Sequence, residues 1–572
     1  MRLMNGWSKL KKYVLADISQ DTHTRDSFSL GHWDVDDTSN NNQNNKSTKE
    51  TQVNLPQERP LGGENNHFNM SCDMDRNVDW LKTKFSYPKS KGLIIRSLLL
   101  GSKLTKGTVV YLDDQVNAQL LYETVINPLL TAKFPEDLPL KSDMFKDEIL
   151  RNGQIKSISS LEELVQEILN GAAVLIVNGL KEAVSIDVKG GEERGLESPK
   201  TENVILGSQV GFTENLHTNL SLIRRRLNTP DLMVETGVVG TISRTEISVI
   251  YLKSIANSEL VNEVRRRIAA IKIDYIGDSG MIEQLIDDRP NSIYPGLLST
   301  ERPDRATTQI VDGYVCIMVN NSPFALIVPS QFPLFLQTAE DSYLRWQYSS
   351  FLRIIRTVGF FLSMYLPALF VAVANYHQEM IPTTLVLAIA STRESVPLPV
   401  AAEAFLLESM FELIREAGVR IPSVIGPTIG IVGALILGQA AVQANIVSPI
   451  MVIITSATAL ASYTIPNYNM QFTTRILRFV FLACASFMGL IGIVLLSMIL
   501  WTDWISSNHF GVPSFAPITP HHPGENSLLR SPMYKQNKRP ISVRPRKRLK
   551  QPDAQNTDVP TTPDQEGDGA YS

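Results

Sequence analysis

The sequence predicts an α/β region of two related subdomains, followed by an all-α polytopic membrane domain, with disordered tails at both ends. Charged residues crowd the chain before Arg356 and become sparse after it. Before that point, short strand-like apolar runs alternate with segments whose apolar residues recur at helical intervals. After it, apolar runs are long enough to cross a bilayer. We therefore expect one part in the cytoplasm and one part in a membrane.

The composition argues against several classes of protein. A net charge of −4 over 572 residues gives no indication of nucleic acid binding. The three cysteines, Cys72, Cys316 and Cys484, are too far apart for a metal-ligand spacing or a disulfide framework, which fits a reducing compartment. The sequence has no Walker loop, no ligand pattern among its eight histidines and no catalytic constellation. We therefore expect no catalytic residues, no cofactor and no metal site.

Residues 1–77 are expected to form a disordered extension. The tract DDTSNNNQNNKSTKETQ, at 36–52, cannot bury enough apolar surface to order itself. The start of the chain also lacks an apolar run long enough for a signal peptide. The soluble region that follows is therefore expected in the cytoplasm.

The soluble region contains a weak internal repeat, which predicts α/β subdomains at 78–200 and 201–345. A shift of 140 places VVYLDDQVNAQLLYE on VIYLKSIANSELVNE, and a shift of 142 places GAAVLIVNGLKEA on GYVCIMVNNSPFA. Both copies read as a strand, helices and then a hairpin. Chance similarity between ordinary α/β segments is the alternative. The identical pairs include Tyr111 with Tyr251, Asn117 with Asn257, Gly171 with Gly313 and Asn178 with Asn320.

The membrane domain is expected at 350–505, with four clear apolar segments. A further run, at 380–390, is too short to cross alone, so whether 378–422 crosses the membrane stays open. Trp501 and Trp504 follow the last segment, where an aromatic belt is expected. The predicted spans lie near 357–376, 425–444, 446–465 and 476–500.

The last segment, 510–572, is expected to be a proline-rich, basic cytoplasmic tail. Its run KQNKRPISVRPRKRLK is a positive-inside signal, and Arg345, Arg353 and Arg356 flank the first span. Both ends of the membrane domain are therefore expected in the cytoplasm, which requires an even number of crossings and agrees with four. The alternative is that the basic run is only solvated or lies on anionic lipid.

The second predicted span carries small residues at every fourth position. Such a ladder lets another helix approach closely, either within the protein or between protomers. A glycine-rich span without a special partner is the alternative. The ladder consists of Gly426, Gly430, Ala434 and Gly438.

A charged stripe lies between the predicted spans, on a segment at 403–420 that is expected to be an amphipathic helix. At about 100° per residue its charges fall near one arc. The helix either lies on the membrane surface or borders a water-filled path; a third interpretation is that the charges only hold helices together. We expect the arginines to pair with the lower glutamates, which leaves Glu408 the first candidate for an ion-facing group. The pore or gating candidates are Glu408, Glu412, Arg415, Glu416 and Arg420.

At these residues the chain resembles the A-subunit family of bacterial spore germinant receptors, the GerA type. One departure precedes GFTEN, where the family usually has a Gly-Pro-Arg run and this chain has Ser208 and Gln209. Any role of an arginine there would be absent from this chain. The matching segments are GFTENLHTNLSLIRRRL (211–227), STERPDR (299–305), LPALFVAVANYHQEMIPTTL (366–385), ESMFELIREAGVRIP (408–422) and IGIVGALILGQAAVQANIVSP (429–449).

The resemblance implies a subunit of a nutrient-sensing complex in the inner membrane of dormant spores. Such a subunit works with a permease-like B subunit and a lipoprotein C subunit, and nutrient recognition is implied mainly in the B partner. Several A subunits are implied to form a homo-oligomeric ring around an ion path. With the charge pattern, this predicts a multi-pass protein of the spore inner membrane whose α/β region and tail face the cytoplasm.

Three other functions fit parts of the sequence. The first is the related accessory subunit that assists release of dipicolinic acid, which shares the fold and which the neighbouring genes would distinguish. The second is a secondary transporter that acts alone, which inverted repeats among the spans would support; the sequence has none that we find. The third is a structural membrane anchor, and the charged helix argues against it.

Overall fold

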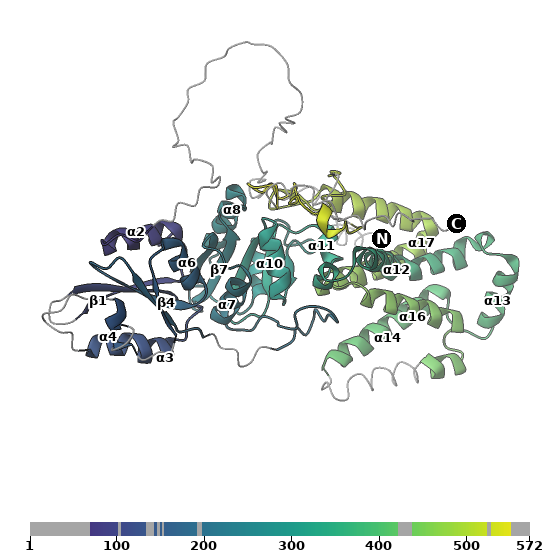
Figure 1. Ribbon diagram of the computed structural model, residues 1–572. Coiled ribbons are helices and arrows are strands. Elements are labelled where there is room, and N and C mark those ends of the chain that lie inside the picture. The colour runs from purple at the N-terminus through teal and green to yellow at the C-terminus, as the bar shows by residue number, and fades with distance from the viewer. Residues whose placement is uncertain are drawn as a thin grey trace, which may run out of the picture. The chain divides into compact units, whose positions relative to one another are not determined.

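The structure is a computed structural model (Figure 1), in which the described residues form two five-stranded sheets, a short two-stranded ribbon and a helical C-terminal part. Its contacts divide the chain into two compact units, Met1–Arg194 with Leu220–Glu235, and Gly195–Asn219 with Thr236–Ser572. The residues that the structure describes are 69–100, 105–132, 142–145, 149–150, 154–190, 197–420, 438–522 and 528–550.

The first sheet has the strand order β1-β2-β4-β5-β3, with every neighbouring pair antiparallel. Successive side chains point to opposite faces. Val110 and Val174 belong to a core that includes α2 and α6, whereas Val109 and Leu175 belong to a second core that includes η2 and α4. The sheet is therefore buried on both faces, which explains the uninterrupted apolar run of β4. The elements are α2 (Met74–Lys84), β1 (Leu93–Leu100), β2 (Thr105–Leu112), α3 (Ala118–Leu121), η2 (Tyr122–Ile126), α4 (Asn127–Thr131), α5 (Ser142–Met144), β3 (Ile155–Ile158), α6 (Leu161–Leu169), β4 (Ala172–Val177) and β5 (Ala183–Asp187).

The second sheet has the order β6-β7-β9-β10-β8, which is the order of the first sheet with each strand replaced by its counterpart. Tyr111 lies on β2 and Tyr251 on β7, the second strand of each sheet. The internal repeat therefore appears in the topology. The elements are α7 (Leu216–Arg226), β6 (Leu232–Val239), β7 (Thr245–Leu252), α8 (Ser258–Ala269), α9 (Ser279–Ile286), β8 (Leu298–Thr300), α10 (Pro303–Val311), β9 (Val315–Val319) and β10 (Ala325–Val328).

The paired asparagines of the repeat have the same local role in both copies. The Asn117 side chain accepts a hydrogen bond from the Gln119 amide at the start of α3, and the Asn257 side chain accepts one from the Glu259 amide at the start of α8. Asparagine is a preferred N-cap because its side-chain oxygen satisfies an amide that lacks a helical partner. The two copies of the repeat therefore share an asparagine N-cap at the start of the corresponding helix.

The paired glycines end a helix in both copies. Gly171 follows α6 with a φ of +89°, and Gly313 follows α10 with a φ of +99°. Only glycine adopts this backbone region without a steric penalty, which explains why it ends so many helices. The same turn leads each helix into the next strand, β4 or β9.

Two helices of the C-terminal part, α12 and α17, are long and apolar enough to cross a membrane, and α16 is a shorter apolar helix. They correspond to the first, fourth and third predicted spans. Residues 425–437 of the second predicted span lie outside the described residues, so the expected four crossings are not established. The elements are α11 (Phe332–Phe335), η4 (Ala339–Ser342), α12 (Trp346–Tyr376), η5 (Gln378–Met380), α13 (Thr383–Arg393), α14 (Val400–Arg420), α16 (Pro449–Tyr463), α17 (Tyr468–Ser506), β11 (Asn508–His509) and β12 (Val512–Pro513).

The described part of the C-terminal tail differs from the disordered segment that the sequence predicts. Residues 528–550 include η6 (Met533–Lys535) and belong to the compact unit that contains most of the second sheet. The Arg539 guanidinium donates to the Val311 carbonyl over 2.7 Å, and Lys550 lies 2.5 Å from Asp312. The prediction of disorder rested on composition, and composition does not contain the tertiary contacts that basic side chains of the tail make with a carbonyl and a carboxylate at the end of α10.

An aromatic cluster surrounds Trp504, in the last turn of α17. Trp504 is buried and stacks on Tyr294, with ring centroids 4.0 Å apart, and it meets the edges of Phe332 and Phe515. In this chain Trp504 is therefore a core residue that joins segments far apart in the sequence, in contrast to the aromatic belt position that the sequence predicts.

Candidate functional site

The charged stripe lies on α14, which the sequence forms for ordinary reasons. The helix is rich in alanine, leucine and glutamate, all good helix formers. Pro399 precedes it, Glu403 is in its first turn and Arg420 in its last, the distribution that complements the helix dipole. The stripe is therefore carried by a continuous helix of 21 residues.

The centre of the stripe is an ion-pair network between α14 and α17. Arg478 is 2% exposed and Glu408 is completely buried, and their charged atoms are 2.9 Å apart. The same guanidinium donates to Glu412 over 2.6 Å. Arg475, one turn earlier on α17, donates to the other Glu412 oxygen over 3.1 Å. One arginine therefore joins two glutamates that are one turn apart on α14.

Arg415 links the same network to α16. Its guanidinium lies 3.6 Å from Glu412, donates to the Ser462 hydroxyl over 2.9 Å, and sits over the Tyr463 ring at 4.7 Å. Cation–π contact and a hydroxyl acceptor together favour a charged arginine in a partly desolvated position. α14 is thus fastened to two neighbouring helices through charged groups.

The first turn of α14 makes a separate polar contact. Glu403 is completely buried, and one of its oxygens accepts hydrogen bonds of 2.5 Å from both the amide and the hydroxyl of Ser448. Ser448 is the N-cap of α16. Arg393 lies 3.7 Å from the other Glu403 oxygen. A buried carboxylate therefore fixes the start of α16 against the start of α14.

The last turn of α14 has a different environment. Glu416 and Arg420 form an i,i+4 ion pair of 2.6 Å, with side chains 65% and 77% exposed. Leu413, one turn earlier on the same side, is also exposed. The stripe therefore divides into a buried part, which faces α16 and α17, and an exposed part at the end of the helix.

The expectation that Glu408 is the freest glutamate is wrong for this chain. Glu408 is buried and paired with Arg478, whereas Glu416 is exposed. The prediction failed because it considered pairing only within α14, and the strongest partner comes from α17. Arg475, Arg478 and Glu403 were missed. Two arginines three residues apart, at the start of an otherwise apolar predicted span, were the signal for the first two.

The small-residue ladder falls mostly outside the described residues, as Gly426, Gly430 and Ala434 do. Gly438 is described, and a Cβ atom added there would meet only Val452, at 3.9 Å. A closer approach occurs elsewhere: a Cβ on Gly359 of α12 would lie 2.1 Å from the Thr464 hydroxyl. Among the described residues, one close approach of this kind therefore lies between α12 and the end of α16.

The segment 299–305 forms a second charged cluster, in the unit of the second sheet. Arg302 is buried and pairs with Asp304 at 2.7 Å, and it donates to the Ser208 carbonyl over 2.7 Å. Arg305 forms an ion pair with Glu202 and donates to the Leu334 carbonyl over 2.7 Å. The cluster holds a long loop against the start of α10. Because Arg302 binds the backbone of Ser208, this contact does not depend on the side chain there.

No group of three or more histidine, cysteine, aspartate or glutamate side chains that could hold a metal ion occurs within the described ranges. The charged groups of α14 instead pair with arginines and hydroxyls. Their chemistry is that of ion pairing between helices and, at the exposed end, of contact with solvent.

The comparisons with known proteins agree on one family. A profile of the family described as Bacillus/Clostridium GerA spore germination protein matches residues 79–542. Spore germination protein KA of Bacillus subtilis (strain 168) is 38% identical over 82% of this chain and 87% of its own length. Spore germination protein B1 of the same strain is 34% identical over 84% of this chain and 99% of its own length.

One solved structure is also similar. The N-terminal domain of the A subunit of the Bacillus megaterium spore germinant receptor GerK3 is 27% identical, with a TM-score of 0.37, over 46% of this chain and 97% of that chain.

Proposed function

The chain belongs to the GerA family of spore germination proteins, and from that premise we propose that it is the A subunit of a nutrient germinant receptor in the spore inner membrane. It acts with a permease-like B subunit and a lipoprotein C subunit, and it has no enzymatic activity. The similarity to spore germination proteins over most of their length supports this proposal. Nutrient recognition is assigned mainly to the B partner.

We propose that the α/β region at 78–345 and the tail at 510–572 face the cytoplasm, and that 350–505 forms a multi-pass membrane domain. The two long apolar helices, α12 and α17, support a membrane location. The basic residues beside them support the orientation, because lysine and arginine are retained on the cytoplasmic side. The ladder of Gly426, Gly430, Ala434 and Gly438 is assigned to helix packing in the assembled protein.

Several copies of the chain form a ring, and α14 borders an ion path at its centre. The observation that carries this proposal is the division of the charges on α14. The buried network of Glu408, Glu412 and Arg415 fastens the helix to its own chain, and the exposed pair of Glu416 and Arg420 lies uncovered at the C-terminal end of the helix. In a ring, one exposed glutamate per chain becomes a ring of carboxylates, which attracts cations. The buried network is assigned to gating, because it sets the position of α14.

The experiment is to delete the gene, to restore it with a tagged copy, and to add a defined nutrient to the spores. The proposal predicts that cation release and germination are lost on deletion and return with the tagged chain. It also predicts that the B and C subunits co-purify with that chain. Normal nutrient-induced cation release in the deletion strain would contradict the receptor function. If the tagged chain purifies without the B and C subunits, the result would favour the accessory-subunit function instead.

A further inference from the structure

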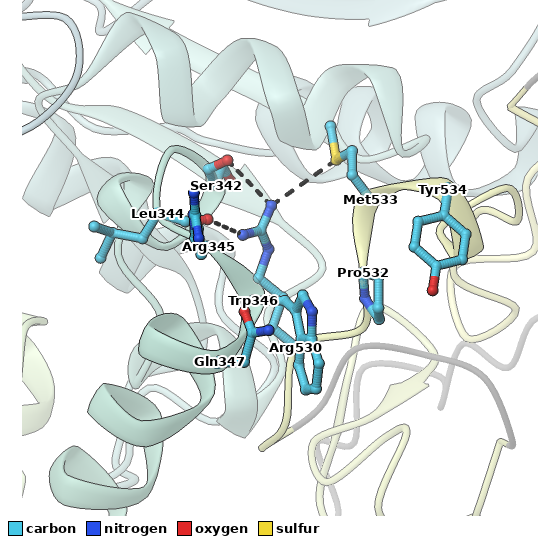
Figure 2. Close-up of a pocket in the computed structure, with 9 residues that line it drawn as sticks. All are labelled: Ser342, Leu344, Arg345, Trp346, Gln347, Arg530, Pro532, Met533 and Tyr534. Atoms are coloured by element: carbon cyan, nitrogen blue, oxygen red, sulfur yellow. Dashed lines mark hydrogen bonds between the residues drawn. The ribbon is translucent and has the colours of Figure 1, made fainter. Parts of the chain in front are cut away.

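A groove opens where the tail meets the start of α12. It has a volume of about 410 Å³ and is formed by the η4–α12 junction together with the tail segment around η6. Figure 2 shows the Arg530 side chain between these two segments. The groove is lined by Ser342, Leu344, Arg345, Trp346, Gln347, Arg530, Pro532, Met533 and Tyr534.

Arg530 holds the two walls of the groove together. Its guanidinium donates to the Leu344 carbonyl over 2.6 Å and to the Ser342 carbonyl over 3.1 Å (Figure 2), and its own amide donates to the Ser350 hydroxyl over 3.1 Å. The side chain is largely buried. These hydrogen bonds therefore fix the tail segment with Met533 and Tyr534 beside the start of α12.

The lining combines exposed apolar surface with positive charge. Trp346, Met533 and Tyr534 are 44%, 71% and 73% exposed. Arg345 contributes a second guanidinium, and Lys535 lies over the Tyr534 ring at 5.9 Å. No aspartate or glutamate is among the nine lining residues. The groove therefore complements a ligand that has an anionic group next to an apolar body.

A further exposed apolar face lies on α12 beyond the groove. Phe351, Ile354 and Val358 follow one another at helical spacing and are 61%, 45% and 50% exposed. If α12 crosses the membrane as proposed above, the groove lies where the span begins. Tryptophan, tyrosine and basic residues concentrate at that level, because their apolar bodies and polar ends suit the boundary between headgroups and chains.

We propose that this groove binds an anionic phospholipid, and this inference depends on the proposed membrane location of α12. Arg345 and Lys535 supply positive charge for the headgroup phosphate. Trp346 and Met533 contact the start of an acyl chain, which continues along Phe351. The bound lipid would tie the tail to the start of the span, so the basic tail would act as a lipid-dependent support for α12.

The test measures how much phosphatidylglycerol the full chain retains. The chain is placed in vesicles of phosphatidylcholine with a minor fraction of phosphatidylglycerol, extracted in mild detergent, and analysed by mass spectrometry for retained lipid. We expect selective retention of phosphatidylglycerol, reduced about fivefold by R345Q and by K535Q, since one basic side chain near an anionic surface contributes about that factor. The matched control is K547Q, which removes an exposed charge of the same tail; unlike Lys535, Lys547 does not adjoin a residue that lines the groove.

Four results would overturn the inference. If K547Q loses as much phosphatidylglycerol as R345Q and K535Q do, the lipid is attracted diffusely by the whole tail. If R345Q and K535Q retain as much phosphatidylglycerol as the unchanged chain, the groove is not the binding site. Displacement of the lipid by excess inorganic phosphate would identify a free anion as the ligand. A chain that ends at Lys550 should retain the same amount of lipid; a marked increase would mean that the acidic residues after it occupy the groove.

A separate experiment tests the membrane location of α12, on which this inference depends. The chain is floated with vesicles of phosphatidylcholine alone and washed with alkaline carbonate. Loss of the chain from the vesicles contradicts the membrane location of α12. A chain that stays in the vesicles without a preference for phosphatidylglycerol contradicts only the groove.

Discussion

The two parts of α14 contain the same kinds of charged residue in different surroundings. Glu408 and Glu412 face Arg478 in the packed interior, whereas Glu416 faces Arg420 in the open. A buried charge is tolerated only when it is paired, while an exposed pair contributes little to stability. The difference teaches that the periodicity of a stripe locates charges on a helix but does not tell which of them the rest of the chain covers.

The largest expected effect comes from removing the shared arginine of the buried part. The R478M variant leaves Glu408 without its ion-pair partner and Glu412 without one of its donors, and breaking a buried pair in this way costs about 3–5 kcal/mol. We expect a much lower unfolding temperature of the purified chain in detergent. The matched control is R420M on the exposed pair, which should change stability by less than about 1 kcal/mol. Similar losses in both variants would abolish the contrast between the two parts.

A second variant tests the polar contact in the first turn of α14. The E403A variant leaves the Ser448 amide and hydroxyl without their acceptor, and an unsatisfied buried polar group costs about 1–3 kcal/mol. E403Q keeps an oxygen acceptor and should recover most of that loss. Thermal unfolding of the two variants side by side measures the difference, and equal stability would show that the hydrogen bonds to Ser448 contribute nothing.

Another carboxylate, Glu283 on α9, extends the comparison to pH. Burial, with repulsion from Asp287 and Asp278, raises the pKa of Glu283 from 4.5 to about 7, although Asn469 donates to it. The folded chain then holds this proton more tightly than the unfolded chain, so its contribution to stability falls as the pH rises from about 4.5 to about 7. E283Q should flatten that part of the profile of unfolding temperature against pH. A profile unchanged by the substitution would contradict the assignment.

The smallest effect on stability is expected at the exposed end of α14, where the effect on function is expected to be specific. E416Q removes a charge that has only an exposed partner, so the unfolding temperature should shift little. In the assembled receptor it should lower the preference for cations over anions, because a ring of carboxylates is lost. Reversal potentials in a planar bilayer measure this preference. An unchanged preference would leave the exposed pair without a role in the ion path.

The sequence predicted the repeat of the two sheets because its matched residues have strong local preferences. Asn117 and Asn257 each start a helix, and Gly171 and Gly313 each take a positive φ that other residues avoid. Such roles depend on neighbours in the chain, so a comparison of two segments can find them. The charged cluster of α14 was located for the same reason, since helical spacing is local.

The pairing of those charges was not predictable in the same way. Arg478 is 70 positions after Glu408 in the chain, and only the packing of α17 on α14 brings them together. The tail gives a second example: Lys550 meets Asp312, and Arg539 meets the carbonyl of Val311, through tertiary contacts that composition does not contain. Local patterns therefore found the elements and the stripe, whereas long-range contacts decided which side chains stay accessible.

The central claim is that the exposed C-terminal end of α14 borders the ion path. The direct measurement is cysteine accessibility in the assembled receptor, with the native Cys72, Cys316 and Cys484 replaced. We predict that a charged, membrane-impermeant thiol reagent modifies E416C and changes the cation flux. The control A404C lies at a completely buried position and should not react. Modification of E416C without a change in flux, or a flux change only with A404C, would contradict the account.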